Sequence, residues 1–405
     1  MTGLESYVPI VGQQNIDDLK LLAERLKGKV VQNVNSTAHG GGVAEILNSM
    51  VPLLNELGVK TRWDVIKGSD RFFEATKKFH NALHGRKEKI VRKDYEIFNE
   101  YSKKNLEEME FDADIVVIHD PQPVAMVQKK SHDRWIWRCH IDISNPNKKV
   151  WDFVKKHVKK YNAVIYSSPA FLQKLNMRQF LIAPSIDPLT DKNKELPRET
   201  INSVLDKYGI DKKKPIIAQI SRYDYLKDPV RVIDAFRLVR KYHDCQLVFA
   251  GNKAADDPES DRVLAEVKEK AGKDPEIHPL VIPPETNDID INALQRAATV
   301  ILQKSLREGF GLVVTEALWK GKPVVASAVG GIPLQIKHKY SGLLCHSVEG
   351  AAFGVKQFLN SPAFAKRLGE NAKENVRRNF LLTRHLRSYM LLFLSLYNPE
   401  GIVYL

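Results

Sequence analysis

Short runs of β-branched and aliphatic residues alternate with longer segments of helical periodicity along most of this 405-residue chain. This alternation is typical of βαβ units, in which parallel strands form one sheet and helices cover its faces. The strands predicted in the first half are 30–34, 61–65, 115–119, 135–141 and 163–167. Those predicted in the second half are 215–220, 246–250, 279–282, 300–303 and 323–327. The pattern predicts an α/β protein with two doubly wound, Rossmann-like domains.

A proline-containing segment, Ile182 to Pro188, separates the two halves and precedes a polar stretch, as an inter-domain link would. We therefore predict an N-terminal domain over residues 1–183 and a C-terminal domain over residues 184–380. The remaining residues, 381–405, include the strongly apolar run Met390 to Leu396. We expect this C-terminal helix to return to the N-terminal domain, the alternative partner being a second subunit in a homodimer.

The chain has 62 Lys and Arg against 49 Asp and Glu, a net charge of +13 that suggests an anionic partner. Acids are interleaved with the bases, and no basic stripe with aromatic residues occurs, so nucleic-acid binding is not predicted. A non-catalytic polyanion-binding protein remains the non-enzyme alternative.

The compartment is predicted from three further features. Cys139, Cys245 and Cys345 lie far apart in the sequence, which argues against disulfides and against a metal site. The N-terminus lacks the features of a signal peptide, and no apolar run reaches the roughly 20 residues that span a bilayer. We expect a cytoplasmic protein without a membrane span.

The loops that follow strands are where an open α/β sheet binds its ligands. In the segment that follows the predicted strand 300–303, Glu308 precedes a Gly-Phe-Gly-Leu turn, and Glu316 lies in the helix that begins near Leu312. The glycines allow a ligand to approach the backbone, and the helix start offers N–H groups to an anion. The segment suits a phosphate joined to a polyol, whereas the alternative is a tight turn with two solvated carboxylates.

Two further loops carry groups that suit an anionic sugar ligand. Arg222 and Lys227 follow strand 215–220 and could stabilise a departing diphosphate, or could simply pair with Asp224 and Asp228 on the surface. Three glycines, 40–42, join strand 30–34 to the first long helix and could form a nest for an anion or a sugar.

A fourth candidate site combines the ends of two strands. His119 and Asp120 end one strand, and His140 lies in the Arg-Cys-His-Ile-Asp run of the next. A single histidine in an apolar strand is more often a core residue than a catalytic one, so these residues alone leave both interpretations open.

The whole set of motifs resembles a known family. The Glu308 to Glu316 spacing is similar to the signature of retaining GT-B glycosyltransferases, and Arg222 with Lys227 is similar to their diphosphate clamp. Over nearly the whole chain the sequence resembles trehalose glycosyltransferring synthases. The segments that carry this likeness are 33–37, 119–123, 138–142, 184–188 and 307–312. The resemblance implies the GT-B fold, with two Rossmann-like domains facing each other across a cleft.

The resemblance also implies roles in the C-terminal half. Glu308 would face the donor sugar, Glu316 would bind the ribose hydroxyls, and Arg222 and Lys227 would hold the diphosphate. Backbone amides would hold sugar and phosphate oxygens at Gly309, Phe310, Gly311 and Leu312.

In the N-terminal half, the resemblance implies that His140 donates to the donor hexose and that Asp120 positions a sugar hydroxyl. Gly41 and Gly42 would face the catalytic cleft from the acceptor side.

The implied activity is a reversible, retaining transfer of glucose from a nucleoside-diphosphate glucose (NDP-glucose) to glucose, which yields α,α-trehalose. These small molecules are the expected partners, and neither a tightly bound cofactor nor a metal is expected. The alternatives are a retaining trehalose phosphorylase and a GT-B glycosyltransferase with another acceptor.

Overall fold

The structure is a computed structural model that describes residues 3–38, 41–251 and 258–398. The chain divides into two compact units. The first consists of Met1–Ser185 and Leu382–Leu405, and the second of Ile186–Leu381. Within the described chain, no helix is both long enough and apolar enough to cross a bilayer.

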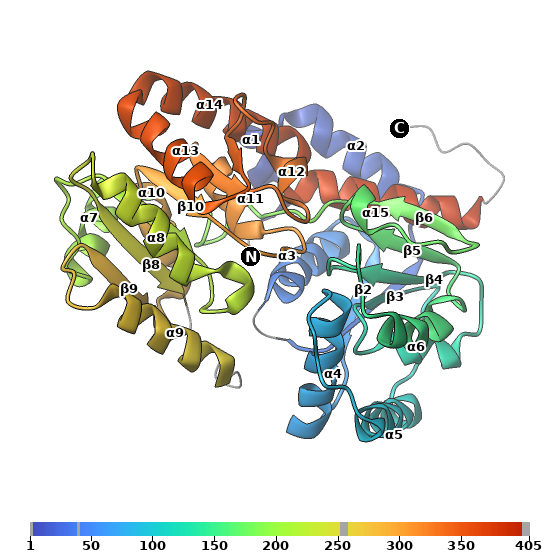
Figure 1. Cartoon of the computed structure of the whole chain (residues 1–405). Coiled ribbons are helices and arrows are strands. Elements are labelled where there is room, and N and C mark those ends of the chain that lie inside the picture. Colours follow the sequence, from blue (N-terminus) through green and yellow to red (C-terminus); the bar gives the residue numbers. More distant parts are fainter. Residues whose placement is uncertain (1–2, 39–40, 252–257, 399–405) are drawn as a thin grey trace. The chain divides into compact units, whose positions relative to one another are not determined.

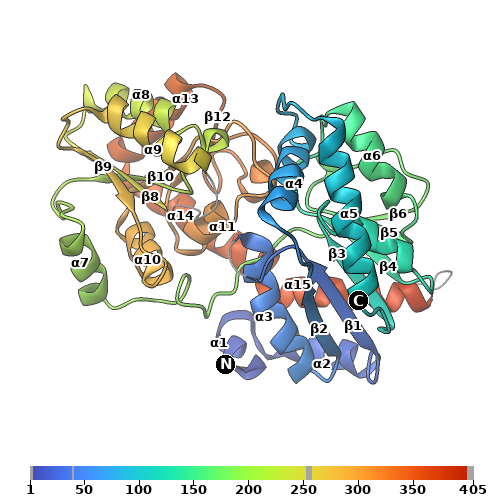
Figure 2. The same ribbon diagram turned by 90° about the horizontal axis from the view of Figure 1, so that it is seen from below.

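The first unit is built on a parallel six-stranded sheet in the order β2-β1-β3-β4-β5-β6 (Figure 1). Its strands are β1 (Val30–Asn35), β2 (Lys60–Val65), β3 (Ile115–His119), β4 (Trp135–Cys139), β5 (Ala163–Tyr166) and β6 (Arg178–Leu181). Its α-helices are α1 (Val8–Val11), α2 (Gln13–Glu24), α3 (Gly42–Glu56), α4 (Asp70–Leu83), α5 (Arg92–Glu108), α6 (Lys148–Val158) and α15 (Leu382–Tyr397). Figures 1 and 2 show α2, α3 and α15 on one face of this sheet and α4, α5 and α6 on the other.

The two faces of this sheet differ in chemistry because side chains alternate along a strand. Trp135, Trp137 and Cys139 of β4 belong to the apolar core on one face. Arg138, which lies between the last two, is fully buried and stands opposite His119 in the β3–β4 register. The central strands therefore bury a polar layer on the face opposite the aromatic core.

Helix α15 covers its apolar residues within the first unit, where it packs against α2 and α3. Its first turns are held by polar contacts to the segment that follows β6. Arg384 Nη2 donates to the carbonyl oxygens of Ala183 and Pro184 at 2.9 and 3.1 Å. His385 Nδ1 donates to the carbonyl of Ala183 at 3.1 Å. The apolar run at Met390 thus has its partner in the same chain.

The second unit has a parallel six-stranded sheet in the order β12-β11-β10-β7-β8-β9. Its strands are β7 (Ile216–Ile220), β8 (Gln246–Gly251), β9 (Ile277–Val281), β10 (Val300–Gln303), β11 (Val324–Ser327) and β12 (Leu343–Cys345). Its α-helices are α7 (Arg198–Lys207), α8 (Pro229–Arg240), α9 (Pro258–Ala271), α10 (Asn287–Ala297), α11 (Leu312–Trp319), α12 (Ile332–Gln335), α13 (Val348–Asn360) and α14 (Pro362–Asn379). Helices α8, α9 and α13 lie on one face, and α7, α10, α11 and α14 lie on the other (Figure 2).

Each sheet has a point at which the strand order reverses. In the second sheet β7 lies between β8 and β10, and in the first sheet β1 lies between β2 and β3. Ligands of doubly wound folds bind outside the carboxyl ends of the strands at such a point. The topology therefore selects the loops after β7 and β10 in the second unit, and those after β1 and β3 in the first.

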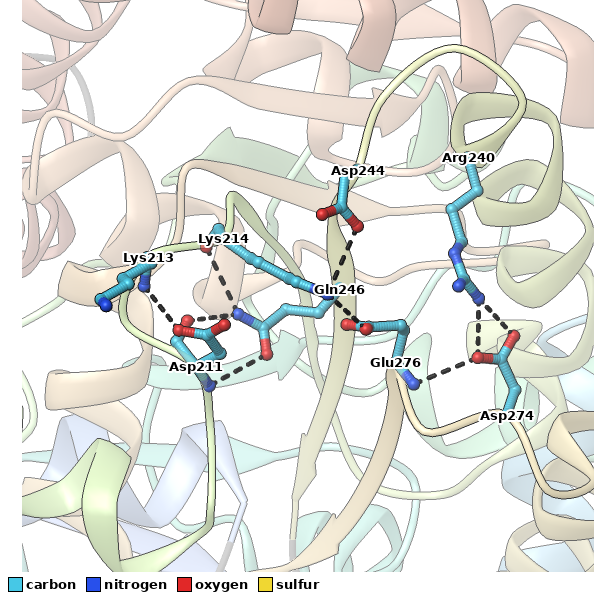
Figure 3. Close-up of polar contacts among 8 residues, drawn as sticks. All are labelled: Asp211, Lys213, Lys214, Arg240, Asp244, Gln246, Asp274 and Glu276. Atoms are coloured by element: carbon cyan, nitrogen blue, oxygen red, sulfur yellow. Dashed lines mark hydrogen bonds and ion pairs between the residues drawn. The ribbon is translucent and has the colours of Figure 1, made fainter.

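A charged cluster lies at the amino ends of the strands of the second sheet (Figure 3). The buried Gln246 donates from Nε2 to the carbonyl of Asp211 at 2.5 Å. Lys214 Nζ lies 2.5 Å from Glu276 Oε1, and Arg240 Nη1 lies 2.6 Å from Asp274 Oδ1. These groups bind one another through hydrogen bonds and ion pairs, away from the carboxyl ends of the strands, where ligands bind.

The predicted elements differ from the structure in two respects. The edge strands β6 and β12 were not predicted, because β12 has only three residues and β6 has four, of which the first two, Arg178 and Gln179, are polar. The strand predicted over 135–141 ends at Cys139, because the next backbone N–H, that of His140, donates to the Asp120 carboxylate at 2.7 Å instead of continuing the ladder.

Candidate functional site

Lys227 and Glu308 form a partly buried ion pair at the switch point of the second sheet. Lys227 Nζ lies 2.7 Å from both carboxylate oxygens, and Ser305 Oγ donates to Oε2 at 3.1 Å. The side chains of Lys227 and Glu308 are 20% and 9% exposed. A backbone bond from Leu306 N to Leu226 O, at 2.7 Å, joins the same two loops. The fold thus brings together two predicted site residues that are 81 positions apart.

A second ion pair lies in the same loops. Lys304 Nζ is 2.5 Å from Asp228 Oδ2, and both side chains are buried. Asp224 accepts a hydrogen bond from the N–H of Leu226 and thereby shapes the turn. Neither aspartate pairs with Lys227, so the alternative of a simple surface pair is wrong for that lysine. Arg222 is exposed and makes no hydrogen bond or ion pair with another described residue.

The turn after Glu308 fits closely against a second glycine loop, which follows β11. A Cβ on Gly330, where φ is +57°, would lie 1.6 Å from the carbonyl oxygen of Glu308. Gly331 N donates to Gly309 O at 3.0 Å. The buried Gln335 donates from Nε2 to the carbonyl of Phe310 at 2.6 Å. Only glycine permits this close approach at position 330. The loop after β11 therefore supports the 308–310 backbone.

The backbone amides at the start of α11 remain available. Among the described residues, none of the N–H groups of 309–312 donates a hydrogen bond. Gly311 adopts the left-handed conformation, with φ +85°, immediately before the helix. The positive end of the helix dipole and these N–H groups favour an anion at this position.

Glu316 lies on α11 and is almost completely buried, with its side chain 2% exposed. Gln295 Nε2 donates to Glu316 Oε2 at 3.1 Å, and Lys192 Nζ lies 4.0 Å from Oε1. Lys192 was not predicted. Its only signal in the sequence is its position four residues after Pro188, the last residue of the predicted link segment.

A strap of residues 187–195 holds Lys192 at this carboxylate, and two buried side chains anchor it, one from α10 and one from the residue that follows α11. Asn292 Nδ2 donates to the carbonyls of Asp191 and Lys194, both at 2.8 Å. Lys320 Nζ donates to Asn193 Oδ1 at 3.1 Å. Burial lowers the pKa of Lys320 to about 7, against the opposing charge of Glu316.

In the first unit, two histidines and an asparagine form a chain of hydrogen bonds at the switch point. The rings of His119 and His140 are joined by a bond of 3.0 Å between His119 Nδ1 and His140 Nε2. His119 Nε2 lies 3.0 Å from Asn33 Oδ1. Asn33 and His119 are buried, whereas His140 is partly exposed. Asn33 belongs to a motif that carried the family resemblance, but no role was assigned to it.

Asp120 is placed beside His140 by an uncommon backbone conformation, φ 65°. Its carboxylate accepts the His140 N–H at 2.7 Å, and Trp137 Nε1 donates to its carbonyl at 2.9 Å. Burial raises the pKa of Asp120 to about 7, although the bond from His140 and the charge of Arg138 oppose the shift. Arg138, which begins the segment 138–142 that carries the family resemblance, is fully buried.

The glycine loop of the first unit lies in part outside the described residues, because His39 and Gly40 are not included. Gly41, with φ +81°, precedes helix α3, and Gly42 begins it. The structure therefore places these two glycines at a helix start after β1.

Comparison with known proteins adds family relationships to this geometry. Residues 33–173 match the family model "Trehalose synthase, N-terminal domain", and residues 201–375 match "Glycosyl transferases group 1". The trehalose synthase of Thermococcus litoralis is 43% identical over 96% of this chain and 95% of that protein. The trehalose synthase of Rubrobacter xylanophilus is 41% identical over 97% of each.

More distant proteins share part or all of the architecture. A trehalose phosphorylase of Grifola frondosa is 29% identical over 86% of this chain but only 54% of that protein. The solved structure of an α,α-trehalose-phosphate synthase (UDP-forming) from Burkholderia xenovorans has a TM-score of 0.74 at 14% identity, covering 91% of this chain and all of that one. This likeness, with the two parallel sheets, shows that the chain has the predicted GT-B fold.

Proposed function

Because the chain belongs to the trehalose synthase family of glycosyltransferases, we propose that it moves glucose from an NDP-glucose to glucose and forms α,α-trehalose with retention. The observation that carries this proposal is the site at the switch point of the second sheet. There the unbonded amides of 309–312, the Lys227–Glu308 pair and the exposed Arg222 lie on adjoining loops.

The donor's diphosphate is assigned to the start of α11. Its negative charge would face the helix N-terminus and the amides of 309–312, with Arg222 free to approach from the β7 loop. Glu316, one turn further along α11, would bind the ribose. Glu308 would face the sugar, and its ion pair with Lys227 would fix the carboxylate in place.

The proposed mechanism needs no covalent intermediate. A retaining hydrolase requires two carboxyl groups about 5 Å apart across the scissile bond. In the roles assigned here, Glu308 and Glu316 serve opposite ends of the donor. We therefore expect the acceptor hydroxyl to attack from the side of the leaving group, with the departing phosphate oxygen taking its proton. Cations and amides at the site would stabilise the diphosphate as its charge develops.

The first unit would supply the sugar-positioning groups. Asp120 accepts a backbone bond through Oδ1, so its second oxygen could orient a sugar hydroxyl. His140, fixed at its backbone by the same bond, is partly exposed and could contact the transferred hexose.

The decisive experiment is a donor panel with glucose as the acceptor. Purified protein would be incubated with ADP-, UDP- and GDP-glucose, and the product's anomeric configuration would be read by ¹H NMR. Formation of α,α-trehalose with one or more donors is expected. Arg222→Ala should lower kcat about 100-fold, because it removes leaving-group stabilisation. Wild-type turnover in that variant would contradict its assignment.

The phosphorylase alternative predicts the opposite substrate preference. A phosphorylase would consume trehalose plus inorganic phosphate and would be inactive with every NDP-glucose. The synthase interpretation is favoured by the near-complete mutual coverage with trehalose synthases, against about half of the phosphorylase's length. Turnover only with trehalose and phosphate would overturn the proposal.

A further inference from the structure

The hydrogen-bond chain at the end of β1, β3 and β4 determines which ring nitrogen of each histidine carries its proton. The oxygen Oδ1 of Asn33 can only accept a hydrogen bond, so His119 must donate from Nε2 across the 3.0 Å contact. A neutral imidazole has a single N–H, which leaves His119 Nδ1 as an acceptor. His140 must therefore donate from Nε2 across its own 3.0 Å contact. The remaining nitrogen of His140, Nδ1, then carries a lone pair.

Only neutral rings can share hydrogen bonds in this way, and the surroundings of both rings favour the neutral form. Burial lowers the pKa of His119 to about 3, with Arg138 adding to the effect. Burial, Arg138, His119 and His385 all lower the pKa of His140. Asp120 is the carboxylate next to the pair, and it faces the backbone N–H of His140. Burial and the Arg138 guanidinium thus keep both rings neutral in spite of the one adjacent carboxylate.

The ring of His140 is also fixed in position, because its backbone and its side chain are both held. The N–H of His140 donates to Asp120, and its ring lies edge to edge with that of His119, with centroids 5.3 Å apart and planes 18° from parallel, as a hydrogen bond between ring nitrogens requires. Asn33, His119 and Asp120 come from β1, β3 and the loop after β3. Three segments of the chain therefore define one orientation and one tautomer.

We propose that Asn33 and His119 are positioning residues that hold His140 in its Nε2–H tautomer, so that His140 Nδ1 accepts a hydrogen bond from a sugar hydroxyl. The sugar contact rests on the proposed function, whereas the tautomer does not. The direction of this bond is the reverse of the one implied by the family resemblance, in which the histidine donates. A sugar hydroxyl suits either direction, since its O–H both donates and accepts.

The tautomer can be measured without any substrate. Long-range ¹H–¹⁵N correlation spectra of ¹⁵N-histidine-labelled protein distinguish a protonated ring nitrogen from an unprotonated one. The signals of the two residues would be assigned by their loss in His140→Gln and His119→Asn. Protonated Nε2 and unprotonated Nδ1 are expected for both rings between pH 6 and 8. A proton on His140 Nδ1 would overturn the proposal, because Asn33 would then present its Nδ2 to His119. An imidazolium at His140 would also overturn it, because the hydrogen bonds from Asn33 and His119 would then not control the protonation of the ring.

Variants of similar shape test the positioning role. Asn33→Leu removes the acceptor, so His140 should show a mixture of tautomers, and kcat/KM for trehalose formation should fall about fivefold, the loss expected for one neutral hydrogen bond. His119→Asn keeps a polar group facing His140, whereas His119→Leu replaces it with an apolar side chain of nearly the same size as asparagine. The Asn variant should therefore retain more of the Nε2–H tautomer of His140, and more of the activity, than the Leu variant.

The matched control is Gln246→Leu, which also removes a buried amide but lies at the amino end of β8, within the charged cluster of Figure 3. This control should lose stability without changing the His140 spectrum or kcat/KM beyond about twofold. If Asn33→Leu retained a single His140 tautomer, or if the control lowered kcat/KM as much as Asn33→Leu, the positioning role would be wrong. If the spectra were as expected but no NDP-glucose supported turnover, the tautomer and the hydrogen-bond chain that sets it would be confirmed, and the proposed function would be wrong.

Discussion

The Lys227–Glu308 pair can be tested by a double-mutant cycle with Lys227→Met and Glu308→Gln. Both contacts measure 2.7 Å, and the side chains are only 20% and 9% exposed, so solvent screens the pair weakly. Two unit charges 4 Å apart attract each other by about 4 kcal/mol at an effective dielectric constant of about 20. The cost of removing both charges from water reduces this gain.

The single variants should differ because different charges are left behind. Lys227→Met leaves the Glu308 carboxylate with only the Ser305 hydroxyl, at a cost of about 3 kcal/mol. Glu308→Gln leaves the more exposed lysine, which can reach water, and should cost about 1 kcal/mol. The double variant should cost less than the sum of the two, with a coupling energy of about 2 kcal/mol.

Hydrogen exchange measured by mass spectrometry suits this test, because it reports on the 221–228 and 304–311 loops rather than on the whole two-unit chain. A loss of about 3 kcal/mol corresponds to exchange about 100-fold faster in these peptides of Lys227→Met, with first-unit peptides unchanged. Additive effects of the two substitutions, with coupling below about 0.5 kcal/mol, would refute the claim that this pair holds the two loops together.

Three further outcomes are expected. Gly330→Ala should raise the donor KM at least about tenfold, because its Cβ would force the Glu308 carbonyl away from a contact of 1.6 Å; unchanged donor kinetics would show that the close fit of the 308–310 backbone against Gly330 does not matter for donor binding. Asp120, whose pKa burial raises to about 7, should give a kcat/KM that increases from pH 6 to 8 as the carboxylate ionises, and this limb should be absent from the residual activity of Asp120→Asn. Lys192→Gln should raise the donor KM about fivefold while Lys194→Gln, on the exposed side of the same strap, should not; equal donor KM values in a steady-state assay would show that Lys192 does not contribute to donor binding.

The main architecture was predictable because a parallel sheet buried on both faces leaves a local record. Strands such as Ile115–His119 and Val300–Gln303 are short apolar runs, and the helices between them keep a 3.6-residue period. The edge strands β6 and β12 left no comparable record. The short strand Arg178–Leu181 begins with two polar residues, and its pairing depends on backbone bonds to β5 rather than on an apolar run of its own.

The candidate site was predictable only where its chemistry is contiguous in the sequence. Glu308 lies shortly before the predicted helix start at Leu312, and Glu316 lies within that helix. Their spacing and the glycines between them could therefore be recognised without a structure. Lys192 could not be recognised in this way, since it meets Glu316 across 124 positions through a strap that the buried amide of Asn292 in α10 holds in place.

The amino-acid sequence by itself determined the periodicities, and with them the two parallel sheets, the loops in which glycines and charges gather and the family to which the chain belongs. Only the tertiary structure decided which of those charges meet. It pairs Lys227 with Glu308, anchors Lys192 beside Glu316 and connects Asn33 to His140 through His119. The physical reason is that periodicity depends on neighbours a few residues apart, whereas an ion pair or a tautomer depends on atoms within about 4 Å in space, which only the folding of distant segments brings together.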